Sequence, residues 1–296
     1  MTDRIIDISE AFAELRVHHQ QLVIKVGEGD PVTTPLAELA ALVVSNPSVT
    51  LSQAVLCGIA EAGGSVVICD RKFLPVAMLL PLQAHGTQAE RFARQAQAPL
   101  PMRKRLWQQI VQAKIRAQGR LLARLHGEDG GLGAMAARVR SGDPDNLESQ
   151  ASRRYWPLLF ADPHFRRGSP GPDQNAYLNY GYAVLRALVA RALCGAGLHP
   201  SFSLQHHNRY DAFRLADDLM EPLRPLVDAA VYEWIQNHDR TQPLDKESKA
   251  WLIGALLERR EAAGESRTLF DLVARYASSL ARCLLGEAGC LEMPEP

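Results

Sequence analysis

The sequence predicts an α+β protein, with a small β-rich domain at the N-terminus and a larger all-helical domain after it. The first 85 residues contain short β-branched runs bounded by Asn, Pro or Gly, which is typical of strands. From about residue 87 onward, apolar residues recur at three- and four-residue spacing, which is typical of helices. At roughly 150 residues per domain, the 296-residue chain is long enough for both domains.

In the N-terminal part we expect strands and one short helix. The strands are the apolar runs at residues 5–8, 21–26, 42–44 and 65–69. The segment 27–31 is rich in Gly and ends in Pro, which predicts a turn. The helix covers residues 52–62, with Ser52 as its N-cap and the pair Gly63-Gly64 ending it.

In the C-terminal part the first helical stretch carries an apolar stripe from Trp107 to Leu125, which lapses once at Gln118. The glycine-rich segment 127–133 lacks the ending of a phosphate loop and predicts a flexible connection. Further helices are expected at 145–160, 173–197, 211–237, 247–263 and 267–286. We therefore place the two domains at residues 1–85 and 86–286, followed by a loose tail at 287–296.

The charges are balanced in total but not along the chain. There are 33 Lys and Arg and 33 Asp and Glu, yet the net charge is −5 over residues 1–90, +9 over 91–167 and −4 over 168–296. Residues 86–125 hold nine basic residues and a single acid, Glu90. Such a stretch is either a solvated helix face or a surface for a polyanion. A solvated face normally mixes signs to offset repulsion, so the ratio favours a polyanion such as nucleic acid.

Composition also limits the class of protein and the cellular compartment. The 47% hydrophobic content excludes a disordered chain. The five cysteines include no C-x-x-C pair, which argues against a zinc ribbon or a disulfide framework and predicts reduced thiols. No signal-peptide pattern and no run of 18 apolar residues occurs, so we expect a soluble, cytoplasmic protein without membrane contact.

Three segments carry residues suited to chemistry. In 143–148, Asp145 or Asn146 can cap the following helix, and Glu148 is then either part of a capping box or free for another role. In 203–207 there are adjacent histidines, His206 and His207, which as chain neighbours rarely face the same target.

The third segment, 215–225, places acids on a helix that otherwise carries core residues. Asp218 and Glu221 are three apart, and Asp217 and Glu221 are four apart, so that each pair shares a face. Like charges at this spacing repel unless a cation neutralises them, and a divalent cation would do so. Two carboxylates and an imidazole suit Mg²⁺ or Mn²⁺, which beside a basic surface favours metal-assisted phosphodiester chemistry.

The same segments resemble the CRISPR-associated integrase-endonuclease family Cas-one, in the version that accompanies type II systems. The glutamate motif of the family is similar to GDPDNLE at 142–148 with RRYW at 153–156. Its central helix is similar to NAYLNYGYAVLR at 175–186, and its histidine motif to GLHPSFSLQH at 197–206. Its acidic helix is similar to FRLADDLMEPLRP at 213–225. Ser203 departs from the pattern, because the family has glycine there.

The resemblance implies both a site and an assembly. It implies catalytic metal ligands at Glu148, His206 and Glu221, with Asp218 as an additional acidic position and Mg²⁺ or Mn²⁺ as the cofactor. It implies a β-rich dimerisation domain, a homodimer, and two such dimers around a dimer of the small partner Cas-two in a heterohexamer. The type II effector nuclease is a further candidate partner.

The implied activity is spacer insertion. The 3′-hydroxyl of a short foreign DNA fragment, the prespacer, attacks a phosphodiester at the repeat boundary of the CRISPR array. We expect basic side chains to hold the backbone of the double-stranded DNA, at Arg103, Lys104, Arg105, Lys114, Arg116, Arg120, Arg153, Arg154, Arg166 and Arg167. Two alternatives are a metal-dependent nuclease without integration activity and a non-catalytic DNA-binding scaffold.

Overall fold

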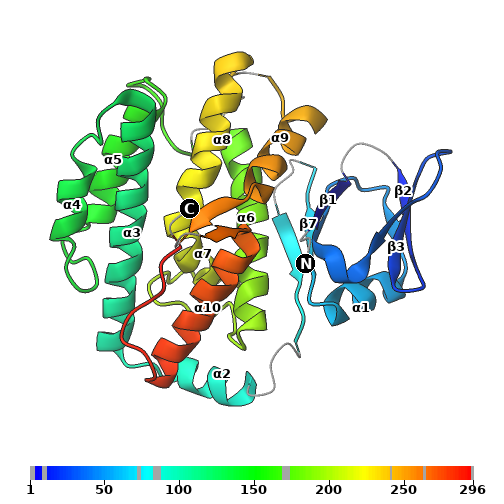
Figure 1. The fold of residues 1–296 in the computed structure, drawn as a ribbon, viewed down its shortest axis with the longest axis horizontal. Helices are drawn as coiled ribbons and strands as arrows, with labels where there is room; N and C mark the ends of the chain where they lie inside the picture. Colours follow the sequence, from blue (N-terminus) through cyan, green and yellow to red (C-terminus); the bar gives the residue numbers. More distant parts are fainter. Residues whose placement is uncertain are drawn as a thin grey trace.

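A computed structural model gives the architecture of residues 4–8, 12–71, 75–82, 88–168, 174–240, 242–262 and 265–294. The N-terminal part, which contains most of the strands, lies next to a larger group of helices (Figure 1). The mixed α+β class predicted from the sequence is therefore confirmed.

Two four-stranded sheets form the N-terminal part. The first has the order β1-β5-β7-β8, in which β1, β5 and β7 are parallel and β8 is antiparallel. The second has the order β4-β3-β2-β6. Their bounds are β1 Arg4–Ile8, β2 Ala13–His18, β3 Gln21–Val26, β4 Val32–Pro35, β5 Leu39–Val44, β6 Thr50–Leu51, β7 Ser65–Cys69 and β8 Pro75–Leu79.

The sequence identified half of these strands. The expected runs match β1, β3, β5 and β7, and helix α1 (Gln53–Glu61) starts after Ser52 as predicted. The Ser52 side chain makes no capping hydrogen bond, however. Strands β2, β4, β6 and β8 were not predicted, because β2 and β4 carry many polar residues and β6 has only two residues.

Two hydrophobic cores position the sheets. Leu15, Leu22 and Leu42 belong to a core shared by the two sheets and α1. On the opposite face of the first sheet, Ala41, Val43 and Val67 join the core of the helical part. The first sheet is therefore covered on both faces, and its strands read as continuous apolar runs.

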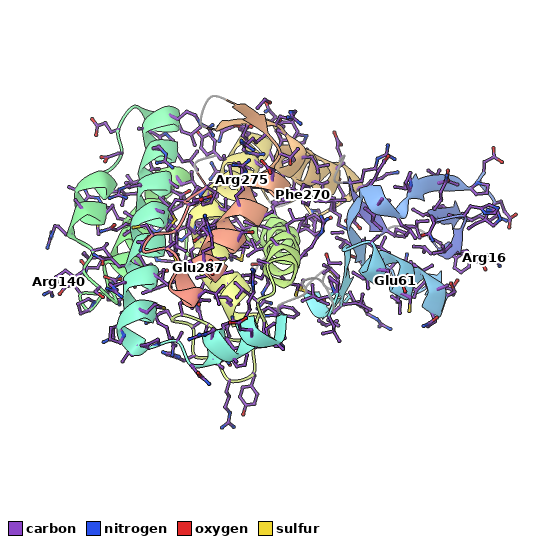
Figure 2. All side chains as sticks on the ribbon, turned by 60° about the horizontal axis from the view of Figure 1, so that its bottom comes forward. Arg16, Glu61, Arg140, Phe270, Arg275 and Glu287 are labelled. Carbon is purple, nitrogen blue, oxygen red and sulfur yellow. The ribbon has the colours of Figure 1, made fainter. Side chains whose placement is uncertain are left out.

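Helix α6 is largely buried and lies between the other helices of this part and the first sheet (Figure 1). Side chains fill the spaces between the elements, and Arg140 and Arg16 lie at opposite ends of the molecule (Figure 2). The helices are α2 Gln88–Ala96, α3 Leu100–His126, α4 Leu132–Arg138, α5 Leu147–Leu159, α6 Asn175–Gly195, α7 Arg214–Met220, η2 Glu221–Leu223, α8 Arg224–Asn237, α9 Lys246–Leu257 and α10 Leu269–Leu285, with a short 3-10 turn η1 at Leu36–Glu38.

Three details correct the sequence-based expectations for the helices. Helix α4 was not predicted, and the single helix expected at 211–237 is divided into α7, η2 and α8. The helix expected at 247–263 ends at Leu257. Strands β9 (Arg260–Ala262) and β10 (Glu265–Arg267) follow as an antiparallel pair. The Arg259 guanidinium donates to the Ser266 backbone oxygen at 2.5 Å and ties this pair together.

The end of the chain is packed, and the expectation of a loose tail is wrong for residues 287–294. Leu291 is buried in the helical core, and its backbone N–H donates to Gln109 of α3 at 2.9 Å. The Glu292 N–H donates to Ser279 of α10 at 3.0 Å. Among the described residues, no helix combines the length and the apolar character that crossing a membrane requires.

Candidate active site

Glu148 is held in the first turn of α5 by an unexpected cap. The Asp143 carboxylate accepts hydrogen bonds from the backbone N–H groups of Leu147 and Glu148, both at 2.9 Å. Asn146 stands at the N-cap position, but its side chain makes no capping bond. The cap predicted at Asp145 or Asn146 is therefore replaced by Asp143. The Glu148 carboxylate reaches away from its own helix start to Lys114.

Glu221 lies in η2, directly after α7, and is 3% exposed. Its Oε1 accepts from Nε of Arg224 at 3.0 Å, and Nζ of Lys114 lies 2.5 Å from its Oε2. Burial raises the pKa of this carboxyl, but the positive charges of Arg224 and Lys114 outweigh burial and lower the pKa to about 2. Glu221 is therefore ionised although it is buried.

Lys114 of α3 connects the two glutamates. Its Nζ lies 2.6 Å from Oε1 of Glu148 as well as 2.5 Å from Oε2 of Glu221, and the residue is 7% exposed. Burial lowers the pKa of Lys114, but the charges of Glu221 and Glu148 raise it above its usual range. We expected Lys114 to contact DNA phosphates. It is instead buried between two carboxylates, which corrects that expectation.

His206 is oriented by Asp218, which is completely buried. The Asp218 carboxylate lies 2.6 Å from Nδ1 of His206 and accepts the backbone N–H of Leu204, also at 2.6 Å. The hydrogen bond that His206 donates to Asp218 raises the pKa of His206 against the effect of burial. Because a carboxylate accepts, Nδ1 carries the proton and Nε2 is left for another partner. His207, by contrast, is exposed.

The loop that carries His206 is fixed at several points. The Ser203 hydroxyl donates to the backbone oxygen of His206 at 2.5 Å. Serine in place of the family's glycine thus adds a hydrogen bond within the loop. The Arg186 guanidinium pairs with Asp211 at 2.5 Å and with Asp217 at 2.7 Å. Burial and a hydrogen bond to the Asp211 carboxylate raise the pKa of Asp217 to about 6.

Two of the three predicted ligands therefore meet around a lysine. Glu148 and Glu221 share the Lys114 ammonium, and the charges of His206 and Glu221 act on each other. In the part of the chain that the structure describes, no three His, Cys, Asp or Glu side chains are arranged to hold a metal ion. Lys114 stands where a cation shared by both carboxylates would stand.

A cleft of about 800 Å³ opens beside Lys114 and Glu221. Arg153, Trp156 and Arg166 also line it. The buried Asp228, another lining residue, accepts hydrogen bonds from the hydroxyl of Tyr155 at 2.8 Å and from that of Tyr182. Tyr155 is fully buried and belongs to the core.

The other basic residues predicted to contact DNA differ in exposure. Two of them are half-buried and donate to distant segments: Arg103 donates to the Leu204 backbone oxygen at 3.0 Å, and Arg167 donates to Asn179 at 2.7 Å. The remaining side chains are exposed on α3, on α5 and after α5, at Lys104, Arg105, Arg116, Arg120, Arg153, Arg154 and Arg166. The exposed set thus includes two cleft residues, Arg153 and Arg166.

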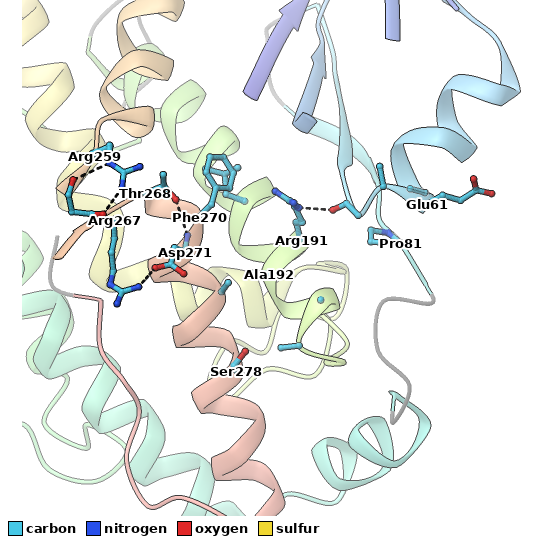
Figure 3. Close-up of a pocket in the computed structure, with 18 residues that line it drawn as sticks. Glu61, Pro81, Arg191, Ala192, Arg259, Arg267, Thr268, Phe270, Asp271 and Ser278 are labelled. Carbon is cyan, nitrogen blue, oxygen red and sulfur yellow. Dashed lines mark hydrogen bonds and ion pairs between the residues drawn. The ribbon is translucent and has the colours of Figure 1, made fainter. Parts of the chain in front are cut away.

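A second cleft, of about 860 Å³, lies where the two parts of the molecule meet (Figure 3). Nε of Arg191, on α6, donates to the Gly63 backbone oxygen at 2.6 Å across this junction. Phe270 and Asp271 of α10 form part of its wall. None of the predicted metal ligands lines it, so its residues belong to the joint between the sheets and the helices.

Comparisons with known proteins agree with these motifs. The family model described as CRISPR associated protein Cas1 matches residues 7–259. The chain is 38% identical over 221 residues to the CRISPR-associated endonuclease Cas1 of Neisseria meningitidis, covering 74% of this chain and 71% of that protein. It is 28% identical over 292 residues to a Cas1 endonuclease of Pyrobaculum aerophilum, covering 92% and 96%.

Solved structures share the fold. A casposase bound to integration product superimposes with a TM-score of 0.81 at 18% identity, covering 99% of this chain and 94% of that chain. A Cas1 protein from Thermotoga maritima gives a TM-score of 0.77 at 17% identity, covering 99% and 100%. The family match, the curated relatives and the fold agree, and the chain belongs to the CRISPR associated protein Cas1 family of endonucleases.

Proposed function

We propose that this protein is the integrase of CRISPR adaptation and inserts short DNA fragments into the repeat array. The observation that carries the proposal is the pairing of Glu148 and Glu221, from separate segments, around one buried lysine beside a basic cleft, with the charge of His206 acting on Glu221. The resemblance of residues 142–225 to type II versions supports assignment to a type II system, in the cytoplasm.

The donor chemistry of the three side chains fits a divalent cation. Oε2 of Glu221 is a buried oxygen that lies 2.5 Å from the Lys114 ammonium and accepts no hydrogen bond from any other described group. A carboxylate and an imidazole whose other nitrogen is held by an acid are the usual partners of such an ion. We propose Glu148, Glu221 and Nε2 of His206 as ligands of Mg²⁺ or Mn²⁺, with Asp218 behind His206.

The proposed reaction exchanges one phosphodiester for another. The 3′-oxygen of the fragment bonds to a phosphorus at the repeat boundary as the bond from that phosphorus to the 3′-oxygen of the array strand breaks. The attacking hydroxyl loses its proton and the leaving oxygen gains one, so no ATP is consumed. A divalent cation held at this site would polarise the scissile phosphate and offset its developing charge.

The surrounding side chains prepare the site for this reaction. Arg224 keeps Glu221 ionised, and Asp218 keeps the proton of His206 on Nδ1. The exposed arginines of the cleft, Arg153 and Arg166, would hold the DNA backbone without reading its sequence. The other exposed basic residues on α3 and α5 would extend that contact along the duplex.

We propose double-stranded DNA and Cas2 as partners. One similar structure contains a casposase with its integration product, and another, with a TM-score of 0.76, is a Cas6-RT-Cas1–Cas2 complex of which this chain covers 36%. A homodimer formed through the β-rich domain, residues 1–85, and contact with the type II effector nuclease complete the proposed assembly. The helical residues 86–286 would hold the catalytic site.

A strand-transfer assay tests the proposal. The full-length protein and Cas2 are incubated with a short duplex and a repeat-containing plasmid, with Mn²⁺ or Mg²⁺. We expect joined products that require the metal and disappear in Glu148→Ala. Asp145→Ala is the matched control, since Asp145 is an exposed acid of the same segment that pairs with Arg140.

Other outcomes would contradict integration. Cleavage of the plasmid without joining would identify a metal-dependent nuclease. DNA binding without any reaction in either metal would identify a scaffold.

A further inference from the structure

The site contains a cation of its own, and this cation is a side chain. The Lys114 ammonium lies 2.6 Å from Glu148 and 2.5 Å from Glu221, and these are two of the three proposed metal ligands. Two carboxylates that share a site repel each other unless a positive charge lies between them. In the metal-free protein Lys114 supplies that charge and keeps both ligands in place.

The position of Lys114 conflicts with that of a shared metal ion. A metal bound by both carboxylates needs the oxygens that Lys114 now contacts, and an ammonium at the same place would repel it. The lysine must therefore move when a cation binds. Its long, flexible side chain makes such a movement feasible while the helix stays in place.

A second position for the ammonium is present one turn along α3. Gln118 is 2% exposed, and its Oε1 accepts no hydrogen bond among the described residues. Residues four apart on a helix share a face, with about 5–6 Å between Cβ atoms. Lys114 and Gln118 also line the same cleft. A buried acceptor without a donor is costly unless another state of the protein satisfies it.

We propose that Lys114 is a displaceable counter-ion with two positions: it bridges Glu148 and Glu221 in the metal-free protein and moves to Oε1 of Gln118 when the divalent cation binds. This inference rests on the proposed metal site. Lys114 is thus a positioning residue, which holds the ligands together before the metal arrives and which lowers the affinity for the metal by competing with it.

Binding of Mn²⁺ alone to the full-length, DNA-free protein tests the proposal by calorimetry. We expect Lys114→Met to bind Mn²⁺ roughly tenfold more tightly, or more, because a competing charge is gone. In EDTA the same variant should melt at a lower temperature, since Glu148 and Glu221 then repel each other. Lys25→Met, an exposed lysine of β3, is the control and should match the wild type in both measurements.

Gln118→Met tests the second position without disturbing the bridging pair. It should weaken Mn²⁺ binding several-fold in the presence of Lys114, because the displaced ammonium loses its acceptor. In the Lys114→Met background it should have no effect, which a double-mutant cycle measures directly. If Lys114→Met fails to fold, the Mn²⁺ affinity of Gln118→Met alone still tests the proposal.

Two negative results have different meanings. Wild-type protein that binds Mn²⁺ with an affinity unchanged by Lys114→Met or Gln118→Met would overturn the counter-ion proposal and leave the metal site standing. Wild-type protein that binds no Mn²⁺ would overturn both.

Discussion

At the scale of single residues, the Asp218 carboxylate does most to define the site. It is fully buried, yet it binds Nδ1 of His206 and the backbone N–H of Leu204. One side chain therefore fixes both the tautomer of the histidine and the path of its loop. A change at Asp218 should impair the site even though we do not propose it as a ligand.

The raised pKa of His206 predicts a specific dependence on pH. Because the folded pKa lies above the unfolded value of about 6.5, charged His206 stabilises the metal-free protein fully below that pH. This contribution is lost as the pH rises through the folded pKa. In EDTA, the difference in melting temperature between wild type and His206→Gln should be largest near about pH 5 and should shrink toward about pH 9.

The affinity of the wild type for Mn²⁺ should rise as the pH rises, because a protonated imidazole cannot bind a metal. His207→Gln, at the exposed neighbour, serves as the control and should show no pH-dependent difference from the wild type. A melting-temperature difference for His206→Gln that stays constant over this range would contradict the Asp218–His206 pairing.

Lys114 shows the limit of residue-level prediction. The sequence places it among nine basic residues over 86–125, and by residue type it does not differ from Arg116 or Arg120. Its partners come from α5 and η2, which only the fold brings together. One signal was present: Lys114 and Gln118 continue the apolar stripe of Trp107, Ile110 and Val111 at helical spacing, and polar residues on such a stripe are buried.

At the scale of elements, close packing between α6 and α8 helps to position the helices that carry the site. Gly181 of α6 lies so close to α8 that a Cβ atom there would stand 2.4 Å from Cγ1 of Val227. Asp228 on α8 binds Tyr182 on α6 and Tyr155 on α5. The close contact therefore aligns three helices, one of which carries Glu148 in its first turn.

Gly181→Ala should destabilise the protein by about 1–3 kcal/mol, because the added methyl group overlaps Val227 in a packed core. Urea unfolding measures the change. Gly195→Ala, at the open end of the same helix, has nothing within 4 Å of its new Cβ atom and should change the stability far less. A second substitution, Val227→Ala, should restore part of the loss. Equal stabilities of both glycine variants would contradict this close packing.

The elements differ in how far the sequence could predict them. The long helices were predictable because each carries its own apolar stripe, as α3 and α6 do. The antiparallel pair of β9 and β10 was missed because each strand has only three residues, too few to show a periodic pattern. The cap on α5 was misplaced since Asp143 lies four residues before Leu147, outside the usual N-cap position.

At the scale of the whole molecule, the zero net charge conceals separate regions. The excess of +9 in residues 91–167 lies on α3, α5 and the segments near them. The N-terminal sheets carry acid in excess, with a net of −5 over residues 1–90. Such separation attracts a polyanion to one side of the molecule and keeps it off the other.

This distribution predicts a steep salt dependence of DNA binding. Fluorescence anisotropy on a short duplex measures the binding constant at several salt concentrations. The slope of its logarithm against the logarithm of the salt concentration should become less steep by about 0.9 for each phosphate contact removed. Arg116→Gln and Arg120→Gln, at exposed positions of α3, should each reduce the slope by about this amount. Arg275→Gln, at an exposed position of α10, should leave it unchanged. A slope that none of these variants alters would exclude α3 from the DNA surface.

The central claim is that Glu148, His206 and Glu221 form one metal site whose place is held by Lys114. Anomalous diffraction from crystals soaked in Mn²⁺ tests this most directly. We predict a single strong peak bound by both carboxylates and by Nε2 of His206, with the Lys114 ammonium moved toward Oε1 of Gln118. A Mn²⁺ peak away from these three side chains, or Lys114 still bridging the glutamates beside a bound ion, would contradict it.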